Sequence, residues 1–357
     1  MSGTSLDGID AVLAEIGPDG QTRLLQTHYL PYPDSLRAQL LALHAPQPDE
    51  IHLAACAGNA LARLYAEAVR TLLDGIAPYS VRAIGFHVQT LRHRPADGYT
   101  LQIGNSALLA ELTGITVVAD FRSRDIAAGG QGAPLVPAFH ARALRHPEHH
   151  RVIANIGGIA NVTDLPPGGP VRGWDTGPGN MLLDALIKRH RDAHYDRDGA
   201  WAASGSIHPG LLAALTRHPY LQQLPPKSAG REQFNLDSLD ATLSRLNEAV
   251  TPADVQATLL EFTALSLADA VRRECHGAQE LYVCGGGAHS GALMQRIAAH
   301  LPEVEVATTA ALGIDPDWVE ALAFAWLARQ AVHHAPGNLP AVTGARGERI
   351  LGAIYPA

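Results

Sequence analysis

Residues 151–165, "RVIANIGGIANVTDL", contain two short apolar runs joined by a glycine pair. Apolar runs of this length with a glycine turn between them are typical of buried β-strands. The turn "PPGG" follows at 166–169, then a third run, "VRGWDT" at 171–176, and a helical pattern, "GNMLLDALIKRH" at 179–190. These residues therefore predict a unit of three strands followed by one helix.

The same order of elements opens the chain. "MSGTS" at 1–5, "IDAVLAEI" at 9–16 and "TRLLQTHYL" at 22–30 have the pattern of strands, and "SLRAQLLALHA" at 35–45 has helical periodicity. Two copies of one unit predict an α/β protein with duplicated lobes, each a mixed sheet covered by helices, and a cleft between the lobes as the natural site. We place the lobes at 1–140 and 141–357, with a C-terminal tail that can return to the first lobe.

The composition argues against several classes of protein. The chain of 357 residues has a formal net charge of −8, a pI near 6.1 and no basic stripe, so nucleic acid is a poor candidate partner. Lys188 and Lys227 are the only lysines, which leaves little material for a P-loop or a Schiff base. Three cysteines without close pairing, no apolar leader and no apolar run of about 18 residues predict a cytoplasmic protein without a membrane span.

Two glycine turns are candidate phosphate sites. "GTSLDGID" at 3–10 and "NIGGIAN" at 155–161 occupy matching positions in the two copies, and their backbone N–H groups could hold an anion without lysine. Either turn taken alone can be a simple hairpin, and the matched placement is what favours a nucleotide. The residues assigned to nucleotide binding in these turns are Gly3, Thr4, Ser5, Leu6, Asp7, Gly8, Ile9, Asp10, Asn155, Gly157 and Gly158.

A third glycine run, Gly285, Gly286 and Gly287, joins the apolar run "ELYVC" to the amphipathic pattern "GALMQRIAAH". A strand, a glycine turn and a helix in this order often contact a nucleotide. The run does not complete the dinucleotide fingerprint, because Ser290 stands where the third glycine should be. The chain also lacks GxxxxGK[ST] and GxSxG motifs, which argues against P-loop kinases and serine hydrolases.

Asp175, in "WDTGPGN", lies where the third predicted strand of the second copy ends and a helix begins. An aspartate that accepts hydrogen bonds from the N–H groups of a helix start stays ionised and could remove a proton as a general base. The alternative is a helix N-cap, which aspartate also favours. The two roles are compatible.

Five further polar residues follow predicted strands or begin a helix. Arg122 and Arg124, after "ITVVAD", could form a fork for a carboxylate-bearing ligand or belong to a salt-bridged surface turn. His87 and Gln89, after "AIGF", could contact polar groups of a substrate, although a structural buried histidine is commoner. Glu320 begins an apolar helix, which it either caps or leaves to point into the cleft.

Together these segments resemble the anhydro-N-acetylmuramic acid kinase family, nearly from end to end. The segments that carry the resemblance are "MSGTSLDGID", "HVQT", "DFRSRDIAAGGQGAPLVPAFH", "NIGGIANVTDL", "WDTGPGNMLLDA", "PKSAGREQFN", "CGGGAHSGALM" and "WVEALAFAWLA". That family belongs to the actin-like, sugar kinase and Hsp70 superfamily. The resemblance therefore implies duplicated actin-like (ribonuclease H-like) lobes with mixed five-stranded sheets.

The resemblance also implies a double reaction. Water opens 1,6-anhydro-N-acetylmuramic acid at its anomeric carbon, and ATP with Mg²⁺ phosphorylates O6 to give N-acetylmuramic acid 6-phosphate in peptidoglycan recycling. Asp175 matches the catalytic aspartate of the family and would activate the water. By the same similarity Arg122 and Arg124 would hold the lactyl carboxylate, Gly285 to Gly287 would lie against adenosine, and the protein would form a homodimer.

The chain departs from the family pattern in two places. Family members usually carry several residues before "MSGTS" that complete the first strand, so a natural start upstream of Met1 is expected, and Val88 stands where glycine is common. Two rival functions stay open: a related kinase for another sugar, and a nucleotide-binding regulator without a small substrate. Metal ligands are unassigned, because the histidines of "HPEHH" at 146–150 have no partner cluster.

Overall fold

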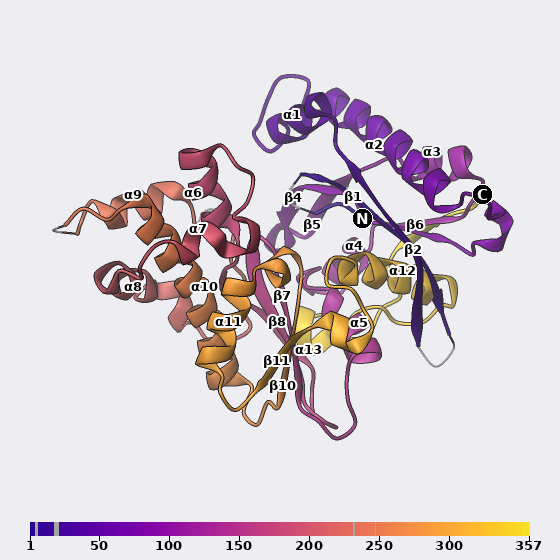
Figure 1. Ribbon diagram of the computed structural model, residues 1–357. Coiled ribbons are helices and arrows are strands. Elements are labelled where there is room, and N and C mark those ends of the chain that lie inside the picture. Colours follow the sequence, from indigo (N-terminus) through magenta and orange to yellow (C-terminus); the bar gives the residue numbers. More distant parts are fainter. Residues whose placement is uncertain (4–5, 18–20, 231–232, 247) are drawn as a thin grey trace. The chain divides into compact units, whose positions relative to one another are not determined.

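The computed structural model describes residues 1–3, 6–17, 21–230, 233–246 and 248–357. Contacts divide the chain into two compact units: unit 1 comprises Met1–Leu144 and Trp318–Ala357, and unit 2 comprises Arg145–Asp317. Helix α12 (Val319–Val332) accordingly packs on strands from the first part of the chain (Figure 1). Each unit is described by itself.

Unit 2 is built on one mixed sheet of five strands in the order β11-β10-β7-β8-β9. β7, β8 and β9 form an antiparallel meander, and β10 runs parallel to both β7 and β11. The strands are β7 (Arg151–Ile156), β8 (Ile159–Leu165), β9 (Arg172–Pro178), β10 (Glu280–Cys284) and β11 (Glu305–Thr308), and the helix after β9 is α6 (Met181–Arg191). The predicted three strands, helix and five-stranded mixed sheet are confirmed in this unit.

Helix α10 (Pro252–Glu274) forms the centre of the helical layer of unit 2. It begins with Pro252, and the Thr251 hydroxyl accepts a hydrogen bond from the Asp254 N–H at 3.2 Å, which is a regular N-terminal cap. Most of its residues are buried because it packs against β9 and against four neighbouring helices (Figure 1). Those four are α6, α7 (Ala200–Ala203), α8 (Pro209–Thr216) and α11 (Gly291–His300), and α9 (Leu236–Leu243) packs on α6 and α8.

The described strands of unit 1 form three separate pieces. They are the hairpin of β1 (Gly8–Ile16) and β2 (Thr22–Pro31), the hairpin of β4 (Gln89–Arg94) and β5 (Tyr99–Ile103), and the sheet β12-β6-β3 with β12 (Ala353–Tyr355), β6 (Val117–Ala119) and β3 (Ile84–Phe86). Backbone bonds link the first and third pieces: the Asp10 N–H donates to the Met1 carbonyl at 2.9 Å, and the Ser2 N–H donates to the His87 carbonyl at 3.1 Å. The Met1 amine also donates to the Asp10 carbonyl at 2.5 Å. The five-stranded sheet expected for the first lobe is nevertheless not one continuous sheet among the described residues, because Met1 and Ser2, which make these bonds, are not part of a strand.

Glycine is required where α12 crosses β3. A Cβ atom at Gly85 would lie 2.2 Å from the carbonyl oxygen of Phe324, so any side chain there would push the helix off the strand. The other helices of unit 1 are α1 (Asp34–Ala42), α2 (Glu50–Leu72), α3 (Ser106–Thr113), α4 (Ser123–Ala127), α5 (Val136–Ala143) and α13 (Pro340–Thr343). Of these, the long helix α2 packs on α3, β1 and β2 (Figure 1).

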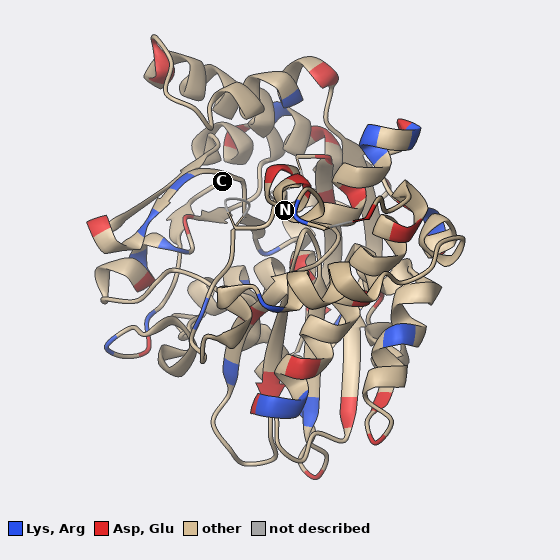
Figure 2. Cartoon of the chain, turned by 90° about the vertical axis from the view of Figure 1, so that its left-hand side faces the viewer, with Lys and Arg blue, Asp and Glu red and all other residues tan. Residues whose placement is uncertain are grey.

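Two further observations concern the distribution of charge and the possibility of a membrane-spanning helix. Basic and acidic residues are interspersed along the ribbon, with no stripe of one sign on the side that Figure 2 presents. Among the residues that the structure describes, no helix combines the length and the apolar character needed to cross a bilayer.

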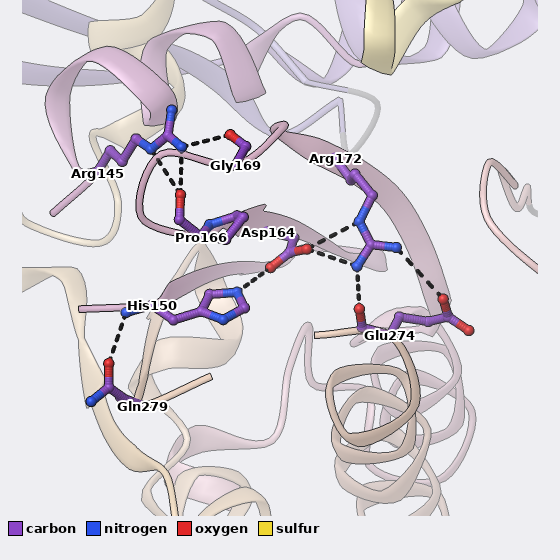
Figure 3. Close-up of polar contacts among 8 residues, drawn as sticks. All are labelled: Arg145, His150, Asp164, Pro166, Gly169, Arg172, Glu274 and Gln279. Atoms are coloured by element: carbon purple, nitrogen blue, oxygen red, sulfur yellow. Dashed lines mark hydrogen bonds and ion pairs between the residues drawn. The ribbon is translucent and has the colours of Figure 1, made fainter. Parts of the chain in front are cut away.

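One end of the unit 2 sheet is fastened by a buried polar network around Asp164 (Figure 3). One carboxylate oxygen of Asp164 lies 2.6 Å from His150 Nε2, and the other accepts from Arg172 Nε at 3.1 Å and Nη2 at 2.8 Å. Arg172 also donates to the Glu274 carbonyl, and the His150 N–H donates to Gln279 Oε1 at 3.0 Å. The network joins β8, β9, the end of α10 and the approach to β10.

We expect an Asp164→Ala variant to lose about 1–3 kcal/mol of unfolding free energy, because the nearly buried His150 ring would lose its partner, while Arg172, whose side chain is 39% exposed, can turn to water. Urea unfolding followed by circular dichroism measures the change. The control is Glu303→Ala, since Glu303 is exposed in the same unit. If the two variants unfolded at the same urea concentration, the network would not stabilise the sheet.

Candidate active site

Asp175 lies inside strand β9, opposite Asn161 of β8, at a bulge where the β8–β9 register shifts between Ala160 and Asn161. Helix α6 begins six residues later, and its N-cap residue is Asn180. The alternative interpretation of Asp175 as the N-cap is therefore wrong. The expectation that N–H groups of a helix start bind its carboxylate is also wrong, because the strand continues past Asp175 to Pro178.

A loop that follows α8 in the chain holds Asp175 in place instead. The Ala229 N–H donates to Asp175 Oδ2 at 2.8 Å, the Tyr220 hydroxyl donates to the Asp175 carbonyl at 2.7 Å, and the Asp175 N–H donates to the Lys227 carbonyl at 3.1 Å. Lys227 Nζ lies 4.7 Å from the centre of the Tyr220 ring and donates to the Tyr220 carbonyl at 3.2 Å. The Ala229 hydrogen bond fixes one carboxylate oxygen of Asp175, and the bonds to Tyr220 and Lys227 fix its backbone. No other hydrogen bond to the carboxylate is found among the described residues.

The environment of Asp175 makes it a weaker acid than an exposed aspartate. Burial raises the pKa of Asp175 to about 6, while the hydrogen bond from Ala229 and the nearby Lys227 ammonium oppose the rise. A carboxylate with a pKa close to neutrality is ionised at pH 7 and yet basic enough to accept a proton. Those are the requirements for a general base.

The pKa of Asp175 predicts a pH dependence. If the ionised form is the working base, kcat/KM should fall about tenfold per pH unit below pH 6 and level off above it. Initial rates from pH 5 to 8, with circular dichroism at each pH to check folding, measure the profile. A rate that stays constant between pH 5 and 7 would contradict the assignment.

The glycine residues predicted to bind nucleotide in unit 2 lie together. A Cβ at Gly285 would be 2.3 Å from Asn155 Oδ1, and a Cβ at Gly287 would be 2.4 Å from Ile156 Cγ2, so only glycine lets this turn pack against the end of β7. The Gly157 and Gly158 carbonyls accept from the Asn180 and Gly179 N–H groups at 2.8 and 2.9 Å. The turn at 157–158 is thereby fixed to the start of α6, beside the Gly285–Gly287 turn.

Sequence reasoning missed the residue that ties these two turns together. Asn180 Nδ2 donates to the Ile156 carbonyl at 3.3 Å and lies 3.7 Å from the Cβ position of Gly286. It likewise missed Tyr220 and Ala229, which hold Asp175. The proline pair before Lys227, in a segment quoted for its resemblance to the kinase family, was the available signal that this loop is ordered.

The nucleotide segment predicted in unit 1 is described only in part, since Thr4 and Ser5 lie outside the described residues. Gly3 is partly exposed, and Leu6 is buried with a positive φ of 58°. Asp7 is exposed, and its Oδ1 accepts from the Gly8 N–H at 2.9 Å. Gly8, Ile9 and Asp10 begin β1, and Ile9 is fully buried, so neither its side chain nor its backbone is exposed to a ligand.

Three of the residues predicted to bind substrate gather in unit 1. Arg122 Nη2 lies 3.1 Å from His87 Nε2, and Arg122 Nη1 donates to the Gly132 carbonyl at 2.8 Å. Burial lowers the pKa of Arg122 to about 10, and the charge of Glu320 opposes that shift, which places Glu320 close enough to interact. Glu320 lies in the first turn of α12, whose N-cap residue is Trp318, so the interpretation of Glu320 as the cap residue itself is wrong.

His87 is a neutral acceptor in this group. Its ring stacks on Phe324 with 3.9 Å between ring centres, and burial, together with the Arg122 charge, lowers the pKa of His87 well below its ordinary value. Gln89 is 1% exposed, and neither atom of its side-chain amide has a partner within the described ranges, as expected of a group that meets a ligand or water. Arg124 is exposed on α4 and is not brought into this group by any hydrogen bond among the described residues.

The described residues do not form a metal site from protein side chains alone. In the part of the chain that the structure describes, no three His, Cys, Asp or Glu side chains lie close enough to hold an ion. Mg²⁺ in kinases needs few protein ligands, because it binds mainly to phosphate oxygens and water with one or two carboxylates. The exposed carboxylate of Asp7, in the predicted phosphate segment, fits that requirement.

The mixed sheet of unit 2, the glycine turns at the ends of β7 and β10 and a half-buried aspartate of raised pKa together indicate an α/β enzyme. The family model described as anhydro-N-acetylmuramic acid kinase matches residues 1–357, and the chain belongs to that family. The chain is 77% identical over 357 residues to the anhydro-N-acetylmuramic acid kinase of Thiobacillus denitrificans, covering 100% of this chain and 96% of the relative. The enzyme of the same name from Pseudomonas putida is 56% identical over 359 residues, with 100% and 98% coverage.

Among solved structures, component A of (R)-2-hydroxyglutaryl-CoA dehydratase from Acidaminococcus fermentans is similar with a TM-score of 0.44 and 12% identity, covering 88% of this chain and 95% of that one.

Proposed function

We propose that this protein is an ATP-dependent kinase that opens the 1,6-anhydro ring of 1,6-anhydro-N-acetylmuramic acid and phosphorylates O6. The product is N-acetylmuramic acid 6-phosphate, an intermediate of peptidoglycan recycling. Membership of the family supports the substrate and the reaction. The observation that carries the mechanism is Asp175, a half-buried carboxylate with a pKa of about 6 whose Oδ2 accepts a hydrogen bond from the Ala229 N–H.

In the proposed reaction Asp175 takes a proton from water. The water oxygen forms a bond to C1 of the sugar as the C1–O6 bond breaks, and O6 forms a bond to the γ-phosphorus of ATP as the bond to the ADP oxygen breaks. Oδ2 of Asp175 accepts the Ala229 hydrogen bond, so we assign the proton to Oδ1. This hydrogen bond holds the carboxylate of Asp175 in position before the substrate reacts. Such positioning is a source of rate acceleration in enzymes.

The nucleotide is assigned to the glycine turns. In unit 2, Asn155, Gly157, Gly158 and Gly285 to Gly287 form one cluster at the ends of β7 and β10, where the exposed Gly158 and Gly286 can offer backbone groups to phosphate. In unit 1 the segment Gly3–Asp10 is the phosphate segment. Mg²⁺ would bind triphosphate oxygens together with the Asp7 carboxylate, and it would neutralise charge on the transferring phosphoryl group.

The buried group in unit 1 is assigned to the sugar. Arg122 is a partly buried cation that can pair with the lactyl carboxylate, which is the only charged group of the sugar. His87 and Gln89 can hydrogen-bond to uncharged polar groups, since His87 is neutral and the Gln89 amide is buried without a described partner. Glu320 would keep Arg122 oriented, and the exposed Arg124 would reach the carboxylate from outside the group.

We also propose that units 1 and 2 are the two lobes of the actin-like fold, that the chain forms a homodimer, and that it works in the cytoplasm. The tail from Trp318 onward, which the contacts assign to unit 1, supports the lobe assignment. Sedimentation analysis of the purified chain tests the homodimer.

A coupled assay of ADP release tests the function. We expect ADP release that depends on 1,6-anhydro-N-acetylmuramic acid, with mass spectrometry detecting the sugar 6-phosphate. Equal turnover of free N-acetylmuramic acid would favour a kinase for another sugar. ADP release that ignores both sugars would favour a nucleotide-binding regulator with slow ATPase activity.

A further inference from the structure

Unit 2 contains a cavity of about 380 Å³ that none of the residues assigned above lines. Its walls come from the start of α6, from α8 and α9, from the middle of α10, and from the segment around residues 217–219, elements that neighbour one another in Figure 1. The apolar part is formed by Leu182, Leu215, Phe234, Leu239 and Phe262. A concave site of this size with mostly apolar walls and a few polar groups is typical of a small-molecule pocket.

The polar groups at this cavity are basic. Arg217 and Arg245 line it, both are exposed, and neither guanidinium has a hydrogen-bond or ion-pair partner among the described residues. No acidic side chain is among the described residues that line the cavity. The other polar linings are already engaged: the Ser238 hydroxyl donates to the Asn235 carbonyl at 2.7 Å, and the Thr242 hydroxyl donates to the Ser238 carbonyl at 2.8 Å.

The imidazole ring of His218 lines the cavity without adding a positive charge. Its Nδ1 accepts from the Tyr220 N–H at 3.3 Å, and its ring lies 4.8 Å from that of Phe234. Burial lowers the pKa of His218, so the ring is neutral at pH 7. The two arginines are thus the positive charges that line the pocket, beside an aromatic wall.

We propose that this cavity binds a small amphipathic anion, with an aromatic or short aliphatic body against Phe234 and Leu215 and a carboxylate at Arg217 and Arg245. The apolar body would gain free energy from leaving water, and guanidinium groups pair with carboxylates through two parallel hydrogen bonds. A neutral apolar ligand would leave both arginines unpaired, and an anion without an apolar body would make no contact with Leu215 and Phe234. The charge and the shape of the site therefore select a molecule with both parts.

The cavity is next to the loop that holds Asp175. His218 and Pro219 line it directly before Tyr220, whose hydroxyl donates to the Asp175 carbonyl, and the Phe234 ring lies 5.8 Å from the Tyr220 ring. A ligand in the cavity would contact residues on both sides of this tyrosine. The binding claim itself does not rest on the proposed kinase function, because binding is measured without ATP or sugar.

The test uses 2-naphthoate as the probe and 2-naphthalenemethanol as its neutral counterpart, with binding to the full chain measured by isothermal titration calorimetry. We expect the naphthoate to bind with one site and at least about tenfold more tightly than the alcohol, as charge-assisted hydrogen bonds to arginine would give. The double variant Arg217→Gln/Arg245→Gln should weaken naphthoate binding by a similar factor. Arg82→Gln, which removes an exposed arginine of unit 1, should leave binding unchanged.

A second variant tests the cavity apart from the charges. Ala214 lines the cavity, and Ala214→Trp should fill it and abolish naphthoate binding while thermal melting shows a folded protein. Equal binding of the two probes, binding that survives the double arginine variant, or binding that survives Ala214→Trp would each overturn the proposal. Naphthoate binding that disappears as protein concentration rises would also overturn it, since a second copy of the chain would then cover the cavity.

Discussion

Replacing Asp175 by asparagine is expected to lower kcat by about 10²–10⁴-fold, because a positioned general base contributes an acceleration of that size. Asparagine has nearly the same shape and can still accept the Ala229 hydrogen bond through its side-chain oxygen. It cannot take a proton from water. Steady-state ADP release with 1,6-anhydro-N-acetylmuramic acid measures the loss.

The stability of the same variant separates a lost base from a damaged fold. The pKa of Asp175 is raised from 3.8 to about 6 in the folded protein, so the folded state binds the proton more tightly than the unfolded chain. Ionisation of Asp175 therefore destabilises the fold as pH rises from about 4 to 6, and that penalty is fully present above pH 6. The Asp175→Asn variant should melt at the same or a higher temperature than the original chain at pH 8. Near-normal turnover, or slow turnover with a lower melting temperature, would remove the evidence for a base.

Replacing Asp125 by alanine is expected to destabilise unit 1 by about 3 kcal/mol, because three buried hydrogen bonds lose their acceptor. Asp125 is 0% exposed, its Oδ1 accepts from Asn338 Nδ2 and from the Thr343 hydroxyl at 2.7 Å each, and its Oδ2 accepts from the Gly132 N–H at 2.8 Å. The carboxylate thereby joins α4, the 129–134 turn and the C-terminal segment around α13 within one unit. A melting temperature about 6–12 °C lower is the expected readout.

The same substitution is expected to weaken sugar binding. The Gly132 carbonyl accepts a hydrogen bond from Arg122, and the Gly132 N–H donates to Asp125. Without Asp125 the turn at Gly132 is no longer fixed, so it positions the Arg122 guanidinium less well. At a temperature where the variant is folded, KM for the sugar should rise more than KM for ATP. Thr343→Ala, which removes one of the three bonds, should give about a third of the loss in stability, and Asp97→Ala, at an exposed position, should give none. A variant that melts like the original chain would show that the network does not stabilise unit 1.

The part of the fold that sequence predicted best is the meander of unit 2. The glycine pair at 157–158 and the turn at 166–169 separate three apolar runs, and each run is a strand, because a turn residue that breaks an apolar pattern is a local signal. The predicted second strand, third strand and helix of the first copy appear as β1, β2 and α1. The first predicted strand, 1–5, is not seen as a strand at residues 1–3, and residues 4–5 lie outside the described part.

For the candidate site, the sequence predicted which residues take part, and the structure corrected the local geometry predicted for them. Asp175 was found from its place beside glycines, but its predicted partners were the N–H groups of the following helix, and its actual partner is Ala229, 54 residues away. Arg122 and Arg124 were treated as an equal pair, and the structure separates them: α4 turns one toward His87 and leaves the other in solvent. Periodicity cannot reveal either fact, because both depend on which loop packs against which strand.

The sequence by itself determined where the strands and turns of the unit 2 meander lie, and it predicted which glycines could approach a phosphate and which acid could act as a base. These properties follow from short-range steric and apolar patterns along the chain. Only the tertiary structure decided the pKa of Asp175, the neutral state of His87 and the buried bonds of Asp125. The reason is that desolvation and hydrogen bonding depend on atoms brought together from distant parts of the chain, such as Ala229 with Asp175 and Thr343 with Asp125.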